Sequence, residues 1–297
     1  MSLAAEEARY SVVAEGVAFP EGLAWAPDDE CLFVTGAADG LGKVIAIALA
    51  RAGAHVVTAD MDEAGLAGTD KQIADLGAAH LAVPCDVGSE KQVQALFQAV
   101  DEKFGQVDIL INNAGVLVTL AAPQDYPLAA WNRTMQVNVT GAFLCARLAG
   151  RRMIARGNGG SIVNLSSIGG LTALAGGSLS YDVSKSAVAQ LTRELAVEWA
   201  RYGIRVNALA PCHFRTRGWS SAADDPAQQQ TIQTIVHGIP LGRMGEPEEI
   251  IGPMLFLLSP AASMVSGIVL PVDGGNLAMN ATAGGVMAGN YNYDSDQ

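Results

Sequence analysis

From Cys31 onward, short runs of β-branched and apolar residues alternate with longer amphipathic segments, and this alternation limits the folds open to the chain. The short runs are apolar at successive positions, which is typical of strands that are covered on both faces. Strands that alternate with helices form βαβ crossovers, and the strands of such units run parallel. The sequence therefore predicts an α/β fold with one doubly wound parallel sheet of about seven strands and helices on both faces.

The expected elements follow from these patterns. The strands are Cys31–Thr35, His55–Ala59, Leu81–Cys85, Val107–Ile111, Ser161–Leu165, Arg205–Leu209 and Gly267–Pro271. The helices are Leu41–Arg51, Glu63–Leu76, Ser89–Phe104, Leu128–Arg156, Ser180–Arg201 and Pro247–Leu258. No internal boundary interrupts this series, so residues 31–275 are expected to form a single domain. Residues 1–30 would then be an N-terminal extension and residues 276–297 a C-terminal tail.

Composition and charge exclude several classes of protein. Half of the 297 residues are apolar and 16% are charged, which is the profile of a compact globular protein. The formal net charge is −12, so the chain has no basic field for nucleic acid or for an anionic membrane surface. No apolar run reaches the roughly eighteen residues that a membrane span needs. The expected partner is therefore a small molecule.

Cysteine usage and the first residues bear on the compartment and on metals. The four cysteines lie far apart and show no CxxC spacing, which favours reduced buried thiols over disulfides or a metal site. Residues 1–9 lack the basic start and the long apolar stretch of a signal peptide. We expect a cytoplasmic protein without a metal centre.

A glycine-rich turn lies between the first strand and the first helix. It reads Thr35-Gly36-Ala37-Ala38-Asp39-Gly40-Leu41-Gly42. Glycines in such a turn allow a tight bend and let the backbone approach a pyrophosphate closely, and the helix N-terminus adds amide donors and a positive dipole. The spacing is GxxxGxG instead of the commoner GxGxxG, but the mechanics are the same. The turn therefore predicts a dinucleotide site.

Asp60 ends the second strand, eighteen residues after Gly42. A carboxylate at this place can accept hydrogen bonds from both hydroxyls of an adenosine ribose, and it would repel a 2′-phosphate. No basic residue stands at position 39, 61 or 62, where Asp39, Met61 and Asp62 are found. We therefore predict NAD as the cofactor in preference to NADP. The alternative is that Asp60 only caps a turn at the end of its strand.

Two further strand ends carry polar residues. Asp86-Val87 closes the third strand, where Asp86 would meet the adenine amino group, and Asn112-Asn113-Ala114-Gly115 closes the fourth. Ligands of open α/β sheets bind along the carboxyl edge, so both strand ends belong to the expected cofactor crevice. Each of them taken alone is an ordinary turn.

Tyr181 and Lys185 are four residues apart, with Ser166 and Ser167 upstream. Four residues make about one helical turn, so the phenol and the amine would lie on the same helix face. A tyrosine with a pKa near 10 is a poor acid–base catalyst at neutral pH, and a neighbouring cation favours the phenolate. The pair is therefore a candidate proton-transfer site. The alternative is an ordinary exposed polar pair.

Taken together, these motifs resemble the classical short-chain dehydrogenase/reductase family over Leu32 to Gly275, which implies a Rossmann-type fold. The resemblance rests on Thr35–Gly42, Asp86, Asn112–Gly115, Asn138, Ser161–Ser167, Tyr181 with Lys185, Arg205–Ala208 with Pro211, Pro240–Arg243 and Val272–Gly275. It implies an oxidoreductase that interconverts a secondary alcohol and a ketone. Family members are usually tetramers, so a homotetramer is expected.

The resemblance also implies roles for individual residues. Tyr181 would exchange a proton with the substrate oxygen, and Lys185 would lower its pKa and bind the nicotinamide ribose. Asn138 would hold a relay water, and Ser167, preferred to Ser166, would hydrogen-bond the substrate oxygen. The residues implied to bind NAD are Gly36, Asp39, Gly40, Leu41, Gly42, Asp60, Met61, Asp86, Val87, Asn112, Asn113, Ala114, Gly115, Tyr181, Lys185, Pro211, Phe214 and Thr216.

This chain departs from the family pattern at two places. Pro211 is followed by Cys212 where the family usually has Gly, so a side chain would crowd the nicotinamide, narrow the pocket, offer a thiol to alkylation or simply fit. Ser167 and Tyr181 are fourteen residues apart, one more than is commonest, which implies an extra loop residue.

The substrate is expected under a lid formed by Cys212 to His237 together with Leu171 and Leu174. Arg215, Arg217 and Trp219 in this lid would suit a carboxylate or a polyhydroxylated substrate, or would be solvated loop residues. Residues 200–203 and 224–226 are similar to the gluconate 5-dehydrogenase-like branch, which suggests a sugar acid or polyol. The alternatives are a hydroxysteroid, a terpenoid alcohol or a 3-oxoacyl thioester as substrate, and a non-catalytic NAD-binding regulator.

Overall fold

The computed structural model describes residues 10–14, 17–20, 30–216 and 226–279 of the chain. Seven strands form the central sheet, namely β3 (Cys31–Thr35), β4 (His55–Asp60), β5 (His80–Pro84), β6 (Ile109–Asn112), β7 (Gly160–Leu165), β8 (Ile204–Pro211) and β9 (Val269–Val272). Their order across the sheet is β5-β4-β3-β6-β7-β8-β9, and every neighbouring pair is parallel. The predicted α/β fold with one parallel sheet is confirmed.

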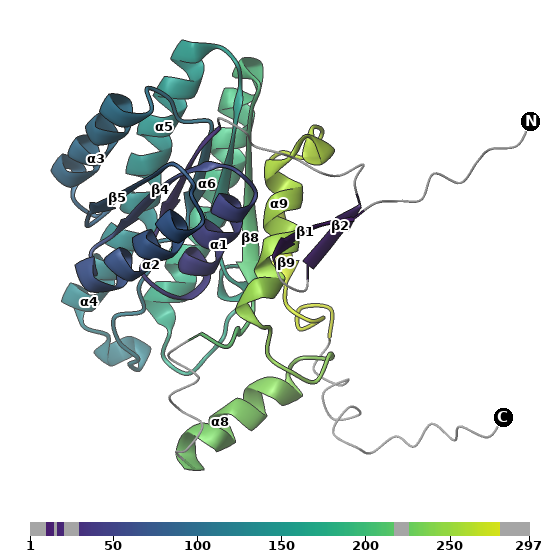
Figure 1. Ribbon diagram of the computed structural model, residues 1–297. Helices are drawn as coiled ribbons and strands as arrows, with labels where there is room; N and C mark the ends of the chain where they lie inside the picture. Colours follow the sequence, from purple (N-terminus) through teal and green to yellow (C-terminus); the bar gives the residue numbers. More distant parts are fainter. Residues whose placement is uncertain (1–9, 15–16, 21–29, 217–225, 280–297) are drawn as a thin grey trace, which may run out of the picture.

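Helices cover both faces of this sheet (Figure 1). They are α1 (Gly40–Arg51), α2 (Glu63–Asp75), α3 (Glu90–Lys103), α4 (Leu128–Met135), α5 (Ala142–Arg156), α6 (Leu179–Trp199), α8 (Pro226–His237) and α9 (Ile251–Leu258). Buried residues of α1, α2 and α9 share one core cluster with the sheet, and buried residues of α3, α5 and α6 share the other. The sheet is therefore enclosed between two layers of helices.

The first strand shows why the two core layers form. Side chains of a strand alternate between the faces of the sheet, so Leu32 and Val34 of β3 point into one layer and Phe33 into the other. All three side chains are fully buried. Phe33 meets Phe97 of α3 edge to face, with ring centroids 5.2 Å apart. This double covering explains the continuous apolar runs in the sequence.

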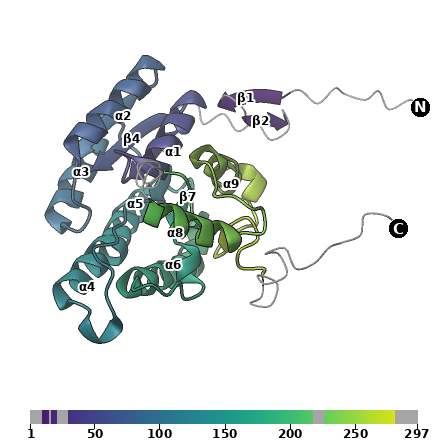
Figure 2. The same cartoon turned by 90° about the horizontal axis from the view of Figure 1, so that it is seen from below.

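The strand order reverses between β3 and β6, which are neighbours in the sheet although two strands separate them in the sequence. Crossovers leave this point in opposite directions, so a crevice opens outside the carboxyl ends of the two strands. The glycine-rich turn after β3 and the Asn112–Gly115 turn after β6 both lie there. α8 lies below the sheet in Figure 1 and in front of it when the molecule is seen from below in Figure 2.

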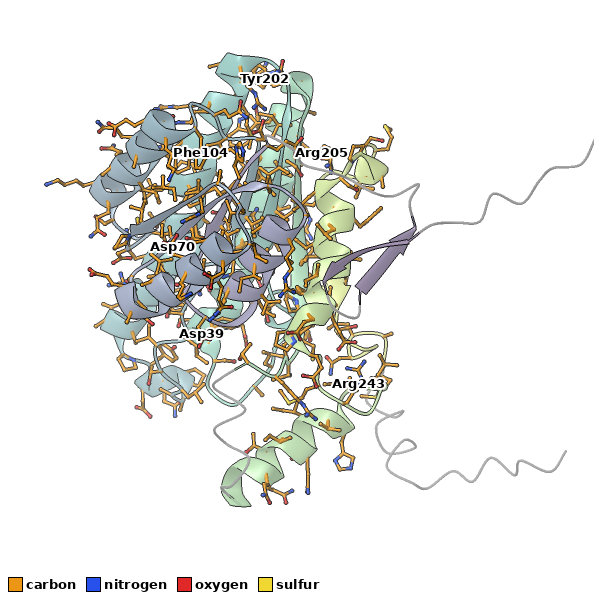
Figure 3. All side chains as sticks on the ribbon, in the orientation of Figure 1. Asp39, Asp70, Phe104, Tyr202, Arg205 and Arg243 are labelled. Atoms are coloured by element: carbon orange, nitrogen blue, oxygen red, sulfur yellow. The ribbon has the colours of Figure 1, made fainter. Side chains whose placement is uncertain are left out.

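Arg205 lies near the start of β8, at the end of the sheet away from the crevice. Figure 3 shows Arg205 far from Asp39 of the glycine-rich turn. Its guanidinium donates hydrogen bonds to the carbonyl oxygens of Leu257, at 2.7 Å, and of Leu258, at 3.0 Å. These bonds join β8 to the end of α9, which fixes the sheet end away from the crevice. In the part of the chain that the structure describes, no helix is long and apolar enough to cross a membrane.

The structure differs from the sequence prediction in three elements. The expected helix Leu128–Arg156 is divided by a π-helical turn, Gln136–Gly141, between α4 and α5. β1 (Tyr10–Ala14) and β2 (Val17–Pro20) form an antiparallel hairpin in the N-terminal extension, where no strand was expected. α8 lies in the segment that was interpreted as a lid. Most other boundaries differ by only one or two residues, because propensity fixes element ends poorly.

Candidate active site

The glycine-rich turn packs against the end of β6 so closely that side chains are excluded. A Cβ atom on Gly42 would lie 2.1 Å from the carbonyl oxygen of Gly36, and Gly36 itself has a φ of +67°. Asn113 fastens the turn by donating from its side-chain nitrogen to the carbonyls of Thr35 and Gly36, both at 2.9 Å. The backbone of the turn is therefore bare and rigid, as a pyrophosphate cradle requires.

The N-terminus of α1 opens from this turn. Asp39 is the N-cap residue of this helix, and its side chain does not accept the usual cap hydrogen bond from the first turn. The first turn of α1 also contains no acidic side chain. Its amide donors and the positive end of its dipole suit an anion such as a pyrophosphate. The residues present here therefore fit the predicted dinucleotide.

A small cavity of about 90 Å³ marks the expected adenosine end of the crevice. It is lined by Gly36, Asp60, Met61, Cys85, Asp86, Val87, Ala114, Gly115, Val116 and Val137. Asp60 accepts hydrogen bonds from the backbone amides of Ala38 and Asp62, both at 3.0 Å, so it does hold the turn. A carboxylate has about four acceptor positions, so this structural role leaves room for ribose hydroxyls.

Arg133 of α4 lies at the rim of the same cavity, and sequence reasoning missed it. Its guanidinium pairs with the carboxylate of Asp86 at 2.8 Å and contacts the sulfur of Met61 at 3.9 Å. The hydrogen bonds from Arg133 and from the Gly88 amide lower the pKa of Asp86 against the opposing effect of burial. A basic side chain therefore does stand near Asp60, although it comes from a distant helix.

Asn112 does not line this cavity. Its side-chain nitrogen donates to the carbonyl of Ala142 at 3.1 Å and to the side-chain oxygen of Asn164 at 2.9 Å, inside the sheet and helix layer. Its neighbour Asn113 faces the crevice instead. Of the predicted pair, only Asn113 thus lines the crevice.

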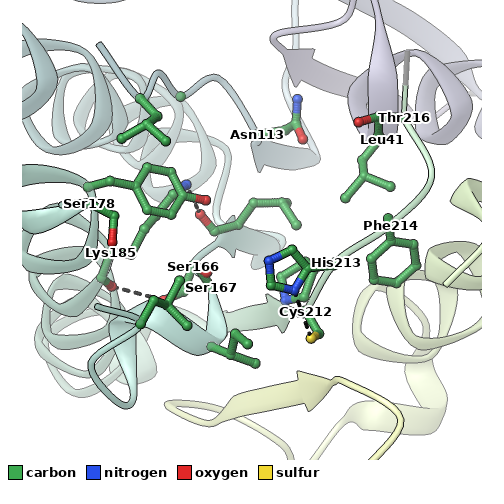
Figure 4. Close-up of a pocket in the computed structure, with 17 residues that line it drawn as sticks. Leu41, Asn113, Ser166, Ser167, Ser178, Lys185, Cys212, His213, Phe214 and Thr216 are labelled. Atoms are coloured by element: carbon green, nitrogen blue, oxygen red, sulfur yellow. Dashed lines mark hydrogen bonds between the residues drawn. The ribbon is translucent and has the colours of Figure 1, made fainter. Parts of the chain in front are cut away.

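A larger cavity of about 370 Å³ lies at the other end of the crevice (Figure 4). It is lined by Leu41, Asn113, Gly115, Leu117, Leu165, Ser166, Ser167, Ile168, Leu174, Ser178, Tyr181, Lys185, Pro211, Cys212, His213, Phe214 and Thr216. Gly115 belongs to both cavities, so one crevice passes over it from the Asp60 end to the Tyr181 end. A Cβ atom on Gly115 would lie 3.2 Å from the amine of Lys185.

Tyr181 and Lys185 face this cavity from α6, where Lys185 is buried and Tyr181 is half-buried. Burial raises the pKa of the Tyr181 phenol, while a hydrogen bond with Ser167 opposes that shift and the negative charge of Asp182 adds to it. Burial lowers the pKa of Lys185 to about 8. The Lys185 amine donates to the carbonyl oxygen of Leu165 at 2.6 Å and lies 5.6 Å from the centre of the Tyr181 ring.

Burial bears on the expected role of Lys185 toward Tyr181. In the protein alone burial dominates and the pKa of Tyr181 is raised, so a lowering of this pKa by Lys185 stays a prediction. The amine is turned toward the main chain of β7, where it has a strong acceptor. Burial disfavours the charged form of both groups, which is the physical reason.

The two serines after β7 differ in what they bind. The Ser166 hydroxyl donates to the carbonyl of Lys185 at 2.9 Å and so holds α6. The Ser167 hydroxyl accepts from the Gly169 amide at 3.1 Å, and its interaction with the Tyr181 phenol lowers the pKa of that phenol. Ser167 is therefore the serine that is coupled to the phenol. Figure 4 shows Ser167 and Lys185 on the same side of the cavity.

Asn138 lies in the π-helical turn and is buried behind Gly115. Its side-chain oxygen accepts from the Val116 amide at 2.7 Å, and its nitrogen donates to the Val116 carbonyl at 3.0 Å and to the Ser184 hydroxyl at 2.9 Å. Both side-chain donor hydrogens are used in this way. Asn138 therefore ties the crevice floor to α6, and π turns of this kind often occur at functional sites.

The segment after β8 supplies the opposite wall of the cavity. Pro211, Phe214 and Thr216 line it, and a Cβ on Gly40 would lie 3.5 Å from the Thr216 methyl group. Arg215 lies 3.5 Å from Glu246 in an exposed ion pair and does not line the cavity. The other two proposed lid residues, Arg217 and Trp219, fall outside the described residues.

The loop from Leu171 to Ser178 lies between Ser167 and Tyr181, where the long spacing predicts an extra residue. Ala175, Gly176 and Gly177 all have positive φ angles, between +61° and +90°. Asp182 holds the loop by accepting from the Ser178 hydroxyl at 2.8 Å and from the Leu174 amide at 3.3 Å. Leu174 and Ser178 line the cavity as a result, whereas Leu171 does not.

Sequence reasoning missed several other lining residues, of which His213 is the most polar. Leu117, Ile168 and Ser178 also line the cavity. The only sequence signal for His213 was its place beside Cys212, inside a segment already assigned to the site. The described residues contain no group of three or more His, Cys, Asp or Glu side chains that could hold a metal ion.

Comparisons with known proteins agree with this geometry. Residues 36–276 match the model of a protein family described as enoyl-(acyl carrier protein) reductase. The cis-4-hydroxycyclohexanecarboxylate dehydrogenase of Sinomonas cyclohexanicum is 42% identical over 246 residues, which are 83% of this chain and 96% of that protein. The galactitol 2-dehydrogenase (L-tagatose-forming) of Cereibacter sphaeroides is 42% identical over 250 residues, 84% of this chain and 95% of that protein.

A solved structure is also similar. The gluconate 5-dehydrogenase from Burkholderia cenocepacia J2315, crystallised in complex with NADP and tartrate, has a TM-score of 0.78 and 35% sequence identity. The match covers 85% of this chain and 97% of that chain.

Because Gly115 has no side chain, we expect a substitution there to weaken the binding of a dinucleotide in the crevice. Gly115→Ala would place a methyl group 3.2 Å from Lys185 and 3.4 Å from the side-chain oxygen of Asn138. The methyl group would occupy the surface over which the dinucleotide is proposed to pass, so the Kd for NADH should rise at least about tenfold, a loss of about 1.4 kcal/mol of binding free energy. Fluorescence titration with NADH measures it.

Gly252→Ala in α9 is the matched control, because a Cβ there would meet nothing within 4 Å. It should leave the NADH affinity unchanged. An unchanged affinity in correctly folded Gly115→Ala would mean that the dinucleotide does not pass over this residue.

Proposed function

The chain belongs to the short-chain dehydrogenase/reductase family and is an oxidoreductase, and from that premise we propose that it interconverts a secondary alcohol and a ketone with NAD. The observation that carries this proposal is the crevice over Gly115, which joins the glycine-rich turn to a cluster of Ser167, Tyr181 and Lys185. A dinucleotide site next to a proton-transfer group suits hydride transfer.

The preference for NAD rests on charge at the Asp60 end. Asp60 would repel a 2′-phosphate, and the nearby Arg133 is engaged by Asp86 in an ion pair at 2.8 Å. Arg133 would have to leave Asp86 before it could neutralise a phosphate. The similar gluconate 5-dehydrogenase is crystallised with NADP, so the test must compare the two cofactors directly.

In the proposed reaction, the bound nicotinamide supplies the hydride acceptor or donor, and the protein manages the proton. Tyr181 would take the hydroxyl proton of an alcohol, or return it to a ketone oxygen. Ser167 is hydrogen-bonded to the Tyr181 phenol and would hold the same substrate oxygen. Together they place the proton acceptor and the orienting hydroxyl on one side of the reacting atom.

Lys185 would bind the nicotinamide ribose and favour the phenolate. Because its amine lies 5.6 Å from the ring centre, it acts on the phenol through space while donating to the Leu165 carbonyl. The side-chain donors of Asn138 are both used by the protein, so we propose that a relay water is held by the main chain of its π turn. These proposed roles follow those that the family resemblance implies for the same residues.

For the substrate we propose a small polyol or sugar acid. The cavity of about 370 Å³ suits a molecule of that size, and it combines apolar walls with several hydroxyl groups and one imidazole. The similar galactitol 2-dehydrogenase and gluconate 5-dehydrogenase act, by their names, on substrates of these classes. Arg215 is paired with Glu246 and does not line the cavity, so it does not offer its charge to a substrate carboxylate there.

The proposal is tested by following NADH and NADPH formation over a panel of polyols, sugar acids, simple secondary alcohols, steroids and 3-hydroxyacyl thioesters. Oxidation of polyols or sugar acids with NAD is the expected result. Turnover of steroids or thioesters alone would establish the alternative substrates. Tight NAD binding without oxidation of any alcohol would establish the non-catalytic alternative.

Tyr181→Phe tests the proton-transfer role. The substitution removes only the hydroxyl group, so NADH binding should be retained while kcat falls by roughly 10²- to 10⁴-fold, the usual contribution of a positioned acid–base group. Stopped-flow kinetics and NADH titration give the two quantities. Retention of most of the wild-type kcat would refute the role.

Asp60→Ala tests the cofactor assignment. Loss of the carboxylate removes the ribose acceptor and the repulsion of a 2′-phosphate, so the ratio of kcat/KM with NAD to that with NADP should fall at least about tenfold. Asp62→Ala is the control for loss of a neighbouring negative charge. A wild-type enzyme that prefers NADP tenfold would contradict the assignment.

A further inference from the structure

The loop of residues 171–178, which leads into α6, meets the active-site cavity at two of its residues. Most of the loop is exposed, whereas Leu174 is half-buried and Ser178 is buried. These two residues are also the ones in the loop that line the cavity. Figure 4 shows Ser178 across the cavity from Phe214. The loop therefore forms part of the substrate wall through Leu174 and Ser178.

Asp182, in the first turn of α6, binds both of these residues. Its Oδ2 atom accepts a hydrogen bond from the Ser178 hydroxyl at 2.8 Å and from the Leu174 amide at 3.3 Å. Asp182 is half-buried and does not itself line the cavity. Hydrogen bonds to an ionised carboxylate are stronger than those between neutral groups. One side chain outside the cavity thus fixes both points at which the loop meets the site.

The backbone of the loop needs such an anchor. Ala175 has a φ of +61°, which a residue with a Cβ atom adopts only at a cost, and Gly176 and Gly177 have positive φ angles as well. A strained segment persists only where its surroundings hold it. The Gly177 carbonyl accepts from the Ala121 amide at 3.3 Å, and the Asp182 carboxylate holds the residues on either side of Ala175.

The second carboxylate oxygen of Asp182 does not hold the loop. Among the described residues this Oδ1 atom has no hydrogen-bond partner, and it lies so close to Gly169 that a Cβ there would come within 2.4 Å of it. The negative charge of Asp182 raises the pKa of Tyr181, which opposes formation of the phenolate. The favourable contribution of Asp182 to the site is therefore its pair of bonds to the loop.

We propose that Asp182 is the positioning residue of the substrate wall, and that it determines how well the site holds the part of an alcohol beyond the reacting carbon. Leu174 belongs to a largely apolar lining with Leu117 and Ile168. Such a lining contributes affinity in proportion to the apolar area that it covers. The inference rests on the proposed function, and it names ring-sized secondary alcohols as the substrates that depend on Asp182.

Two simple secondary alcohols test the inference. Cyclohexanol and propan-2-ol share the reacting group, but the ring extends further into the cavity, so wild type should have the lower KM for cyclohexanol. Asp182→Ala removes both bonds to the loop. It should raise the KM for cyclohexanol at least about fivefold and that for propan-2-ol less than about twofold, because only the larger alcohol loses an apolar contact. The Kd for NADH should stay unchanged.

Asp182→Asn is the conservative variant. Its amide oxygen can replace Oδ2 as the acceptor, and its nitrogen would stand where Oδ1 has no partner, so the KM for cyclohexanol should return to that of wild type. Both substitutions remove the charge, so the pH midpoint of alcohol oxidation should move downward in both. The KM for cyclohexanol separates the loss of the anchor from the loss of the charge.

Ser186→Ala is the matched control on the same helix. It removes a hydrogen bond of 3.0 Å from the Ser186 hydroxyl to the carbonyl of Gly170, which precedes the loop and does not line the cavity. Both KM values should stay as in wild type.

Hydrogen exchange tests the anchor without turnover. The amides of residues 171–178 should exchange at least about fivefold faster in Asp182→Ala than in wild type, and at the wild-type rate in Asp182→Asn and Ser186→Ala. Unchanged exchange in Asp182→Ala, or an equal rise of KM for both alcohols, would overturn the inference and leave the proposed function intact. If wild type oxidises no alcohol with either cofactor, the proposed function itself fails and the inference with it.

Discussion

The buried hydrogen bond from the Lys185 amine to the Leu165 carbonyl, 2.6 Å long, is the interaction on which the site depends. It joins α6 to the end of β7 and brings a cation into a place where burial lowers its pKa to about 8. Ser166 strengthens the same junction by donating to the Lys185 carbonyl. Because α6 is fixed at this junction, Tyr181 and Ser167 lie together in the crevice.

The rest of the crevice follows from strand order and from backbone without side chains. The reversal of order between β3 and β6 opens the crevice, and glycines at 36, 42 and 115 leave its surface bare. Asn113 holds the glycine-rich turn with its side chain, and Asn138 holds the segment after β6 at Val116. His213 and the other residues after β8 line the remaining wall of the cavity.

Much of the fold and of the candidate site could be predicted from the sequence, and the predictions that failed have physical causes. Periodicity predicted the seven strands because both faces of each strand are buried, and spacing predicted the Tyr181 and Lys185 pair because helical geometry is local. Arg133 was missed because it reaches Asp86 from a helix 47 residues further along the chain. The Lys185 amine points to the Leu165 carbonyl, and the Asn112 side chain points to the Ala142 carbonyl. Both orientations depend on tertiary packing, which the spacing of residues along the sequence does not contain.

The central proposal is that the Lys185 amine favours the phenolate of Tyr181 against the effect of burial, and the pH dependence of kcat/KM for alcohol oxidation in wild type and Lys185→Met tests it most directly. Burial alone raises the pKa of Tyr181, so loss of the cation should raise it further. The account predicts that activity rises with pH and that the midpoint moves upward by at least about one pH unit in Lys185→Met. The same midpoint in both proteins would contradict the account.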